Sequence, residues 1–329
     1  MIDSHAHLNF PQLCSQIDEI VADSKKAGVT GIILASSNLK DSVISIELVK
    51  KYPGYLFAST GIHPQKTDPP SPALAGFGEA GPENKTSIEE QLSALESLIT
   101  SHQSLITAIG ETGLDFSPAP PGEEDRSHEE QEKLFLGQIN LAQKYNLPLI
   151  IHARSASAKL RRDKEAVDET IKILADFEQI RADPQPIREN QLRGVFHCYA
   201  GGKKRIQKIL DLEMSLRGLS RAEAISKENR DCHVPTTIGT RNTSDPHWYF
   251  GFDGNLTYDE GLQNILKLIP QDRILIETDA PFLTPAPHRG ETNTPAFLPL
   301  VQQKINEILG KDLTEQIFKN TQILFHLQR

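Results

Sequence analysis

The sequence predicts an α/β fold, a (β/α)8 barrel with loop insertions, and three observations predict it. Strand-like and helix-like segments alternate from end to end of the 329 residues, and eight segments are typical of strands. Continuous apolar runs such as residues 147–151 (LPLII) are typical of strands buried on both faces of a parallel sheet. No G-x-G-x-x-G pattern follows the first strand, which disfavours an open dinucleotide-binding sheet. Eight strand–helix units therefore favour a closed parallel barrel.

The first half of the chain contains four of the predicted strands. Before the second strand, apolar residues at helical spacing end at Gly28, a residue that suits a helix end. A later helix is predicted by a capping box, either Thr86-x-x-Glu89 or Ser87-x-x-Glu90. The four strands are expected within residues 1–8, 28–36, 55–64 and 104–115.

The second half repeats the alternation. Strands are expected within residues 147–154, 192–200, 247–255 and 273–281, and helices over 129–145, 203–212 and 259–268. We expect a single domain over residues 1–329, because one barrel can have this length. Three polar or Pro- and Gly-containing stretches exceed a minimal barrel and are predicted to be loop insertions, which a fold tolerates well; they are 67–86, 180–191 and 213–246.

Composition narrows the class of protein. The net charge is −9, so the chain is a poor candidate for wrapping long nucleic acid, although an enzyme could still grip a strand end locally. No apolar run approaches the ~18 residues of a membrane helix, and no secretory signal is visible at the N-terminus. The three cysteines are far apart, which is typical of reduced thiols. We expect an intracellular protein, cytoplasmic with a nuclear location left open, that is not secreted and has no membrane partner.

Metal-binding side chains recur at the ends of the predicted strands. His5 and His7 are two residues apart, so on a strand they point to one face. In a parallel barrel the carboxyl ends of all strands meet at one mouth. Nitrogen and oxygen ligands without a thiolate suit Zn²⁺, Mn²⁺ or Mg²⁺, and six side chains exceed the needs of one zinc ion. We therefore expect two divalent metal ions sharing a carboxylate. The other four ligand candidates are Glu111, His152, His197 and Asp279.

These motifs resemble the TatD-type metal-dependent deoxyribonucleases. The early H-x-H, then GETGLDF, HAR, HCYAGG, ETDAPFLTP and RGETNTP, follow in the order of that family over nearly the whole chain. The resemblance implies a TIM barrel and metal-dependent hydrolysis of DNA phosphodiesters, often from the 3′ end. It implies that His5, His7 and Asp279 hold one metal, that His152 and His197 hold the second, and that Glu111 bridges them. It also implies that His63 contacts a substrate phosphate. Ser155 stands where the family often has an acidic residue.

The predicted reaction also needs a proton acceptor and cations that hold the substrate strand. Asp279 is our candidate to orient or deprotonate the attacking water, with a purely ligating role as the alternative. The substrate is DNA, with RNA left open, and the proposed activity is a 3′–5′ exonuclease on single-stranded ends. Candidate substrate-binding cations are Arg154, on the same strand face as His152, then Lys203, Lys204 and Arg205 at a helix start, and Arg289 after the eighth strand. A solvated helix turn is the alternative for the three cations at the helix start.

Two other functions compete with the nuclease. A small-molecule amidohydrolase uses a similar barrel, but many such enzymes bridge their metals with a carboxylated lysine on the fourth strand. Here that segment reads AIGETGLD, with Glu111 and no lysine. A non-catalytic barrel that binds nucleic acid would be expected to lack some metal ligands, and none is missing from the sequence.

Overall fold

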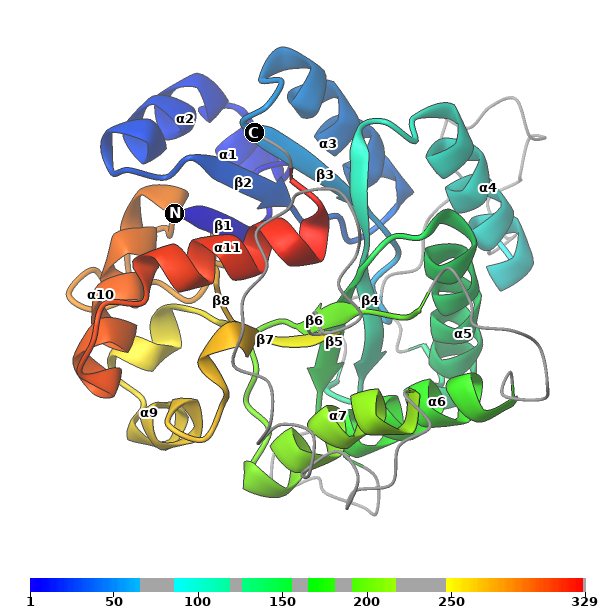
Figure 1. The fold of residues 1–329 in the computed structure, drawn as a ribbon. Helices are drawn as coiled ribbons and strands as arrows, with labels where there is room; N and C mark the ends of the chain where they lie inside the picture. The colour runs from blue at the N-terminus through cyan, green and yellow to red at the C-terminus, as the bar shows by residue number, and fades with distance from the viewer. Residues whose placement is uncertain (66–85, 119–125, 156–164, 181–190, 217–246, 328–329) are drawn as a thin grey trace, which may run out of the picture.

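The strands form one parallel sheet in chain order, so the predicted (β/α)8 barrel is confirmed (Figure 1). The computed structural model describes residues 1–65, 86–118, 126–155, 165–180, 191–216 and 247–327. Each predicted segment contains one observed strand. The strands are β1 (Ile2–Ala6), β2 (Gly31–Leu34), β3 (Leu56–Thr60), β4 (Ile106–Asp115), β5 (Leu149–Arg154), β6 (Gly194–Phe196), β7 (Trp248–Phe252) and β8 (Ile274–Ile276).

The first and last strands meet just beyond the end of β8. Ala6 forms a parallel bridge with Ala280. The amide of Asp279 donates to His5 O at 2.9 Å, and the amide of His7 donates to Ala280 O at 2.7 Å. The hydrogen bonds that close the barrel therefore involve the backbone of His5, His7 and Asp279, and they fix these three predicted site residues relative to one another.

Helices surround the strands. Ser87 caps α4 with Glu90 in a complete capping box, so the second of the two predicted pairs is the correct one. Helix α2 is followed by Gly28, whose φ of +84° favours glycine. The α-helices are α1 (Pro11–Cys14), α2 (Ile17–Lys26), α3 (Leu39–Lys51), α4 (Ile88–Ser101), α5 (His128–Tyr145), α6 (Ala166–Ile180), α7 (Lys203–Leu216), α9 (Glu260–Leu266), α10 (Leu298–Leu309) and α11 (Thr314–Phe325). Short 3-10 helices are η2 (Gly254–Thr257), η3 (Gln271–Arg273) and η4 (Pro295–Phe297).

Helix α11 lies across the amino-terminal end of the barrel (Figure 1). The Asn320 side chain donates to Ile274 O at the start of β8, at 2.9 Å. Leu324 and Phe325 pack in one buried cluster with inward-facing residues of the strands, among them Ile33, Ala108, Ile150, Val195, Tyr249 and Leu275. With this end covered, the polar mouth lies at the carboxyl ends of the strands.

The predicted insertions at 67–86, 180–191 and 213–246 lie, apart from their ends, outside the described residues. The last range was placed too early, because residues 213–216 belong to α7. None of the helices that the structure describes is both long and apolar enough to cross a membrane.

Candidate metal centre

Six side chains predicted to bind metal lie together at the mouth of the barrel. His5 is on β1 and His7 follows it, while Glu111 is on β4 and His152 is on β5. His197 comes directly after β6, and Asp279 comes shortly after β8. Their nitrogen and oxygen atoms form overlapping groups able to hold a cation. The structure thus brings the six together, while the role of each as a ligand stays a prediction.

His5 and His7 form one half of the centre with Asp279. The two Nε2 atoms lie 3.2 Å apart. Asp279 Oδ1 is 3.4 Å from Nε2 of His5 and 3.3 Å from Nε2 of His7. The Nδ1 atoms of both rings are buried, with no hydrogen-bond partner among the described residues. Two imidazole nitrogens facing one carboxylate oxygen are a donor set that fits a divalent cation.

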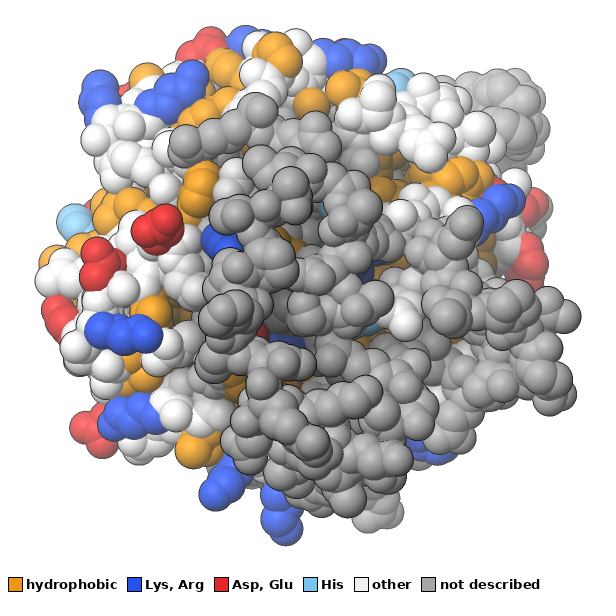
Figure 2. All heavy atoms as spheres, in the orientation of Figure 1, with side chains coloured by type: hydrophobic (Ala, Val, Ile, Leu, Met, Phe, Trp, Pro, Cys, Tyr) orange, Lys and Arg blue, Asp and Glu red, His pale blue; other side chains and the backbone are white. Residues whose placement is uncertain are grey.

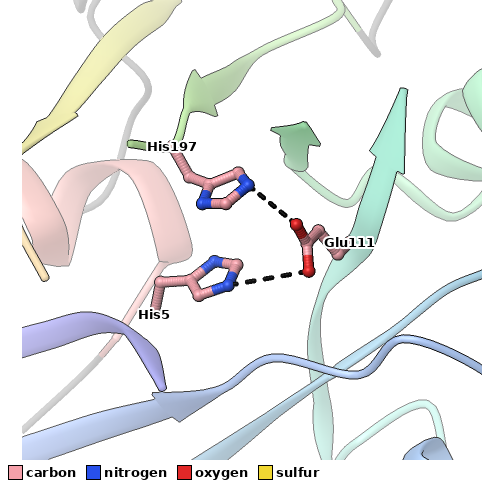
Figure 3. A group of neighbouring side chains, drawn as sticks. All are labelled: His5, Glu111 and His197. Atoms are coloured by element: carbon pink, nitrogen blue, oxygen red, sulfur yellow. Dashed lines mark ion pairs between the residues drawn. The ribbon is translucent and has the colours of Figure 1, made fainter. Parts of the chain in front are cut away.

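Glu111 presents one oxygen to each half of the centre. Oε2 lies 3.8 Å from Nε2 of His5 and 3.6 Å from Nε2 of His7. Oε1 lies 2.7 Å from Nδ1 of His152 and 2.8 Å from Nε2 of His197. Figure 3 shows the carboxylate facing both His5 and His197. The Glu111 carboxylate thus faces both pairs of imidazoles, and its role as a bridge between two ions stays a prediction.

The charges in the centre favour metal binding. Burial raises the pKa of Glu111, but the imidazole of His197 and hydrogen bonds from His152 and His197 hold that pKa well below its usual range. Burial and the neighbouring His197 hold the pKa of His5 well below its usual range. Burial opposes the charge on His152, yet hydrogen bonds with Asp115 and Glu111 raise the pKa of this imidazole to about 9. Burial also opposes the charge on His7 and His197, yet Asp279 raises the pKa of His7 and Glu111 raises that of His197. An ionised Glu111 beside a neutral His5 is ready to bind a cation, whereas a protonated imidazole must first lose its proton.

His63 lies at the edge of this cluster. Its Nδ1 accepts a hydrogen bond from the amide of Gln65 at 3.1 Å. Burial lowers the pKa of His63 to about 3, so the ring is neutral and carries its hydrogen on Nε2. That Nε2 lies 3.9 Å from Glu111 Oε1. A neutral N–H donor facing the centre suits an anionic substrate oxygen, and the phosphate contact of His63 stays a prediction.

Asp115 belongs to the site and was not singled out from the sequence. Its Oδ2 lies 3.1 Å from Nε2 of His152, the ring nitrogen opposite the one that faces Glu111. A carboxylate on the second nitrogen of a ligating imidazole fixes the orientation of the ring. The signal was present, because Asp115 is four residues after Glu111 and even spacing on a strand gives one face.

The predicted substrate-binding cations lie in different surroundings. Arg154 is exposed at the end of β5, and Lys203 and Lys204 are exposed at the start of α7. The Arg289 guanidinium lies over the Tyr258 ring, 3.9 Å from its centroid. Arg205 does not project freely, because its Nη2 pairs with Asp168 at 2.8 Å and with Glu165 at 3.4 Å, which joins α7 to α6. The substrate contacts of Arg154, Lys203, Lys204 and Arg289 stay predictions.

Comparison with known proteins places the chain in a family. A model of the family described as TatD related DNase matches residues 2–236 and 232–326. The chain belongs to the TatD related DNase family. It is therefore a metal-dependent hydrolase, and the resemblance inferred from the motifs is confirmed.

The relatives within this family carry two kinds of name. The chain is 26% identical over 317 residues to an uncharacterised metal-dependent hydrolase of Bacillus subtilis, covering 95% of this chain and 92% of that protein. It is 27% identical over 335 residues to a protein of Pantoea named 3′-5′ ssDNA/RNA exonuclease TatD, covering 99% of this chain and 100% of that protein.

Solved structures agree on the fold. A TatD family hydrolase from Entamoeba histolytica matches with a TM-score of 0.68 and 20% identity, over 100% of this chain and 98% of that one. A TatD homologue from Escherichia coli matches with a TM-score of 0.67 and 19% identity, over 99% of this chain and 98% of that one. At these identities the likeness shows the TIM barrel alone.

Proposed function

We propose that this chain is a two-metal nuclease that hydrolyses phosphodiester bonds of nucleic acid, as a 3′–5′ exonuclease on single-stranded ends, in DNA repair or degradation. The observation that carries the proposal is the position of Glu111, whose Oε1 faces His152 and His197 and whose Oε2 faces His5 and His7. The donor set fits two ions of the Mg²⁺, Mn²⁺ or Zn²⁺ class.

Divalent ions held there would neutralise the charge of the phosphodiester and acidify an attacking water. The chain supplies the remaining functions. Asp279 Oδ1 faces the centre from the edge of β8 and can accept the proton of the attacking water. Asp115 holds the His152 ring in place. The His63 Nε2–H can donate to a phosphate oxygen.

The choice of a nucleic acid over a small amide has two supports. Relatives that match nearly the whole chain carry the name 3′-5′ ssDNA/RNA exonuclease. Strand β4 reads ITAIGETGLD, so it carries Glu111 and has no lysine for carboxylation. Both observations favour phosphodiester hydrolysis over the amidohydrolase alternative.

The test combines metal removal with replacement of Glu111. Chelator-treated protein should not cleave single-stranded DNA, and Mg²⁺, Mn²⁺ or Zn²⁺ should restore cleavage; a 5′ label and a 3′ label report the polarity. Glu111→Gln keeps the shape but removes the charge, so we expect a loss of roughly 100-fold or more in rate, at about 1.4 kcal/mol per tenfold. Bound metal is counted on the same samples.

Glu307→Gln is the matched control, because Glu307 is an exposed glutamate on α10. It should keep both the rate and the metal content. Folded Glu111→Gln that retains a near-normal rate with full metal occupancy would show that Glu111 is not the bridge and that the two-metal proposal is wrong.

A further inference from the structure

Phe282 is an exposed aromatic side chain beside the metal centre. It is 49% exposed, and among the described residues only Leu268, at 45%, is a comparably exposed large apolar side chain. The Phe282 ring lies 6.3 Å from the ring of His7, centroid to centroid, at an interplanar angle of 69°. Covering this ring with a ligand would remove apolar surface from water, which favours binding beside the centre.

The backbone that carries Phe282 is firmly held. The amide of Phe282 donates to Asp279 O at 2.8 Å. Its carbonyl accepts from the buried side chain of Asn293 at 2.6 Å, and the same Nδ2 donates to Thr278 O at 2.8 Å. Asp279 and Phe282 are therefore parts of one fixed turn, and the position of the ring is set relative to a predicted metal ligand.

Phe10 completes the aromatic surface. Its ring stacks on His7 with 4.6 Å between centroids and 23° between planes. It also meets Phe282 edge to face, at 6.2 Å and 76°. Phe10 thus packs on His7 from one side while Phe282 stands exposed beside it. We call this pair, Phe10 and Phe282, the aromatic platform.

We propose that the aromatic platform binds the nucleobase next to the phosphate that the metal centre holds; this rests on the nuclease function proposed above. A nucleotide joins a flat ring to an anion, and the mouth offers the exposed ring of Phe282, packed edge to face on Phe10, beside a cation-binding site. Every base has a π face, so the platform accepts any base and reads neither sequence nor the 2′-hydroxyl.

The platform also explains a preference for unpaired ends. A base can lie on Phe282 only after it leaves its own stack and its pairing partner, and this step is costlier in a duplex than in a single strand. The structure thus assigns to Phe282 the selection of single-stranded DNA or RNA over duplex ends.

Two substrates test the proposal. One is a single-stranded oligonucleotide with ordinary 3′-terminal nucleotides, and the other carries abasic tetrahydrofuran residues at those positions. Replacement of a stacking aromatic by alanine weakens binding roughly 5- to 150-fold. We expect Phe282→Ala to lower kcat/KM on the ordinary strand by that factor, mainly through KM, and to leave the abasic strand unchanged. Phe282→Tyr should behave like the wild type.

Leu268→Ala is the matched control, because it removes the other exposed apolar side chain, and it should change neither substrate. Bound metal should be equal in all variants. Equal slowing of both substrates by Phe282→Ala, or equal cleavage of both by the wild type, would overturn the platform. A wild type that cleaves no oligonucleotide would instead overturn the nuclease function itself.

Discussion

Glu277 is a buried carboxyl group that precedes Asp279 by two residues. Its Oε1 accepts from the amide of Cys198 at 2.5 Å. Its Oε2 lies 3.2 Å from Ser4 Oγ, which in turn lies 3.0 Å from Ile276 O. A serine hydroxyl has one hydrogen, so when it donates to Ile276 O it can accept from a protonated Glu277. Burial raises the pKa of Glu277 to about 8, which fits this neutral form at pH 7.

Glu277→Gln should therefore change how stability depends on pH. The pKa of Glu277 is about 8 in the folded chain against an ordinary 4.5, so its contribution is fully present below 4.5 and is lost as the pH rises through 8. Glutamine imitates the protonated acid and does not titrate. We expect that, as the pH rises from 5 to 8, the free energy of unfolding of the metal-free variant increases relative to that of the metal-free wild type. Urea unfolding at each pH measures both.

Asp3 also makes stability fall as the pH rises, because burial raises its pKa to about 7. Since wild type and variant both contain Asp3, its effect cancels in the difference between their free energies of unfolding. The exposed Glu307→Gln variant should follow the wild type at every pH. Parallel stability curves for wild type and Glu277→Gln would show that the Glu277 carboxyl does not titrate in this range.

At the level of elements, Gly113 allows β4, which carries Glu111, to approach β5, which carries His152. Gly113 pairs with His152, and a Cβ on Gly113 would lie 2.0 Å from His152 O. Its φ is +138°, a conformation that L side chains rarely adopt. The strand pair that carries both ligands therefore depends on the absence of a side chain at this position.

Gly113→Ala should destabilise the fold and weaken metal binding together. We expect a loss of about 1–3 kcal/mol from overpacking, with further cost from the strained backbone. Gly54→Ala is the matched control, since Gly54 has φ +73° but nothing within 4 Å of the added Cβ. Urea unfolding and metal content should separate the two. If Gly113→Ala costs no more than Gly54→Ala and keeps its metal, the close approach of β4 to β5 does not position the site.

The strands could be predicted from the sequence, whereas several contacts between elements could not. Strands were predictable because buried parallel strands are continuous apolar runs, and period-two spacing placed His5 and His7 on one face. The pairing of Arg205 with Asp168 was not predictable, because it depends on how α6 and α7 pack. The exposure of Phe282 was not predictable either, since it depends on how Asn293 holds the turn. Contacts between separate βα units, like those across one long loop, have no local sequence signal.

For the whole molecule, the distribution of charge decides how a polyanion can approach. The chain has a net charge of −9. Figure 2 shows the side of the molecule that carries α11, which is the end opposite the mouth, and there basic and acidic side chains are interspersed over the described surface. The mouth itself contains the carboxylates of Glu111, Asp115 and Asp279. Capture of nucleic acid should therefore depend on bound metal and on a few local cations.

Lys203 and Lys204 are the cations we expect to act in this way. They are exposed in the first turn of α7, which follows the carboxyl end of β6 and so lies at the mouth. Lys25 and Lys26, in the last turn of α2, lie toward the opposite end of the barrel.

Replacing Lys203 and Lys204 together by alanine should weaken binding of single-stranded DNA roughly 2- to 30-fold, at about 0.2–1 kcal/mol per exposed ion pair. It should also lower the slope of log affinity against log salt by about 0.7 per lost phosphate contact. Replacing Lys25 and Lys26 removes the same charge and should change neither quantity. If both double variants lose affinity equally, the effect belongs to net charge; if neither does, Lys203 and Lys204 only solvate a helix turn, and the metal centre alone captures the strand.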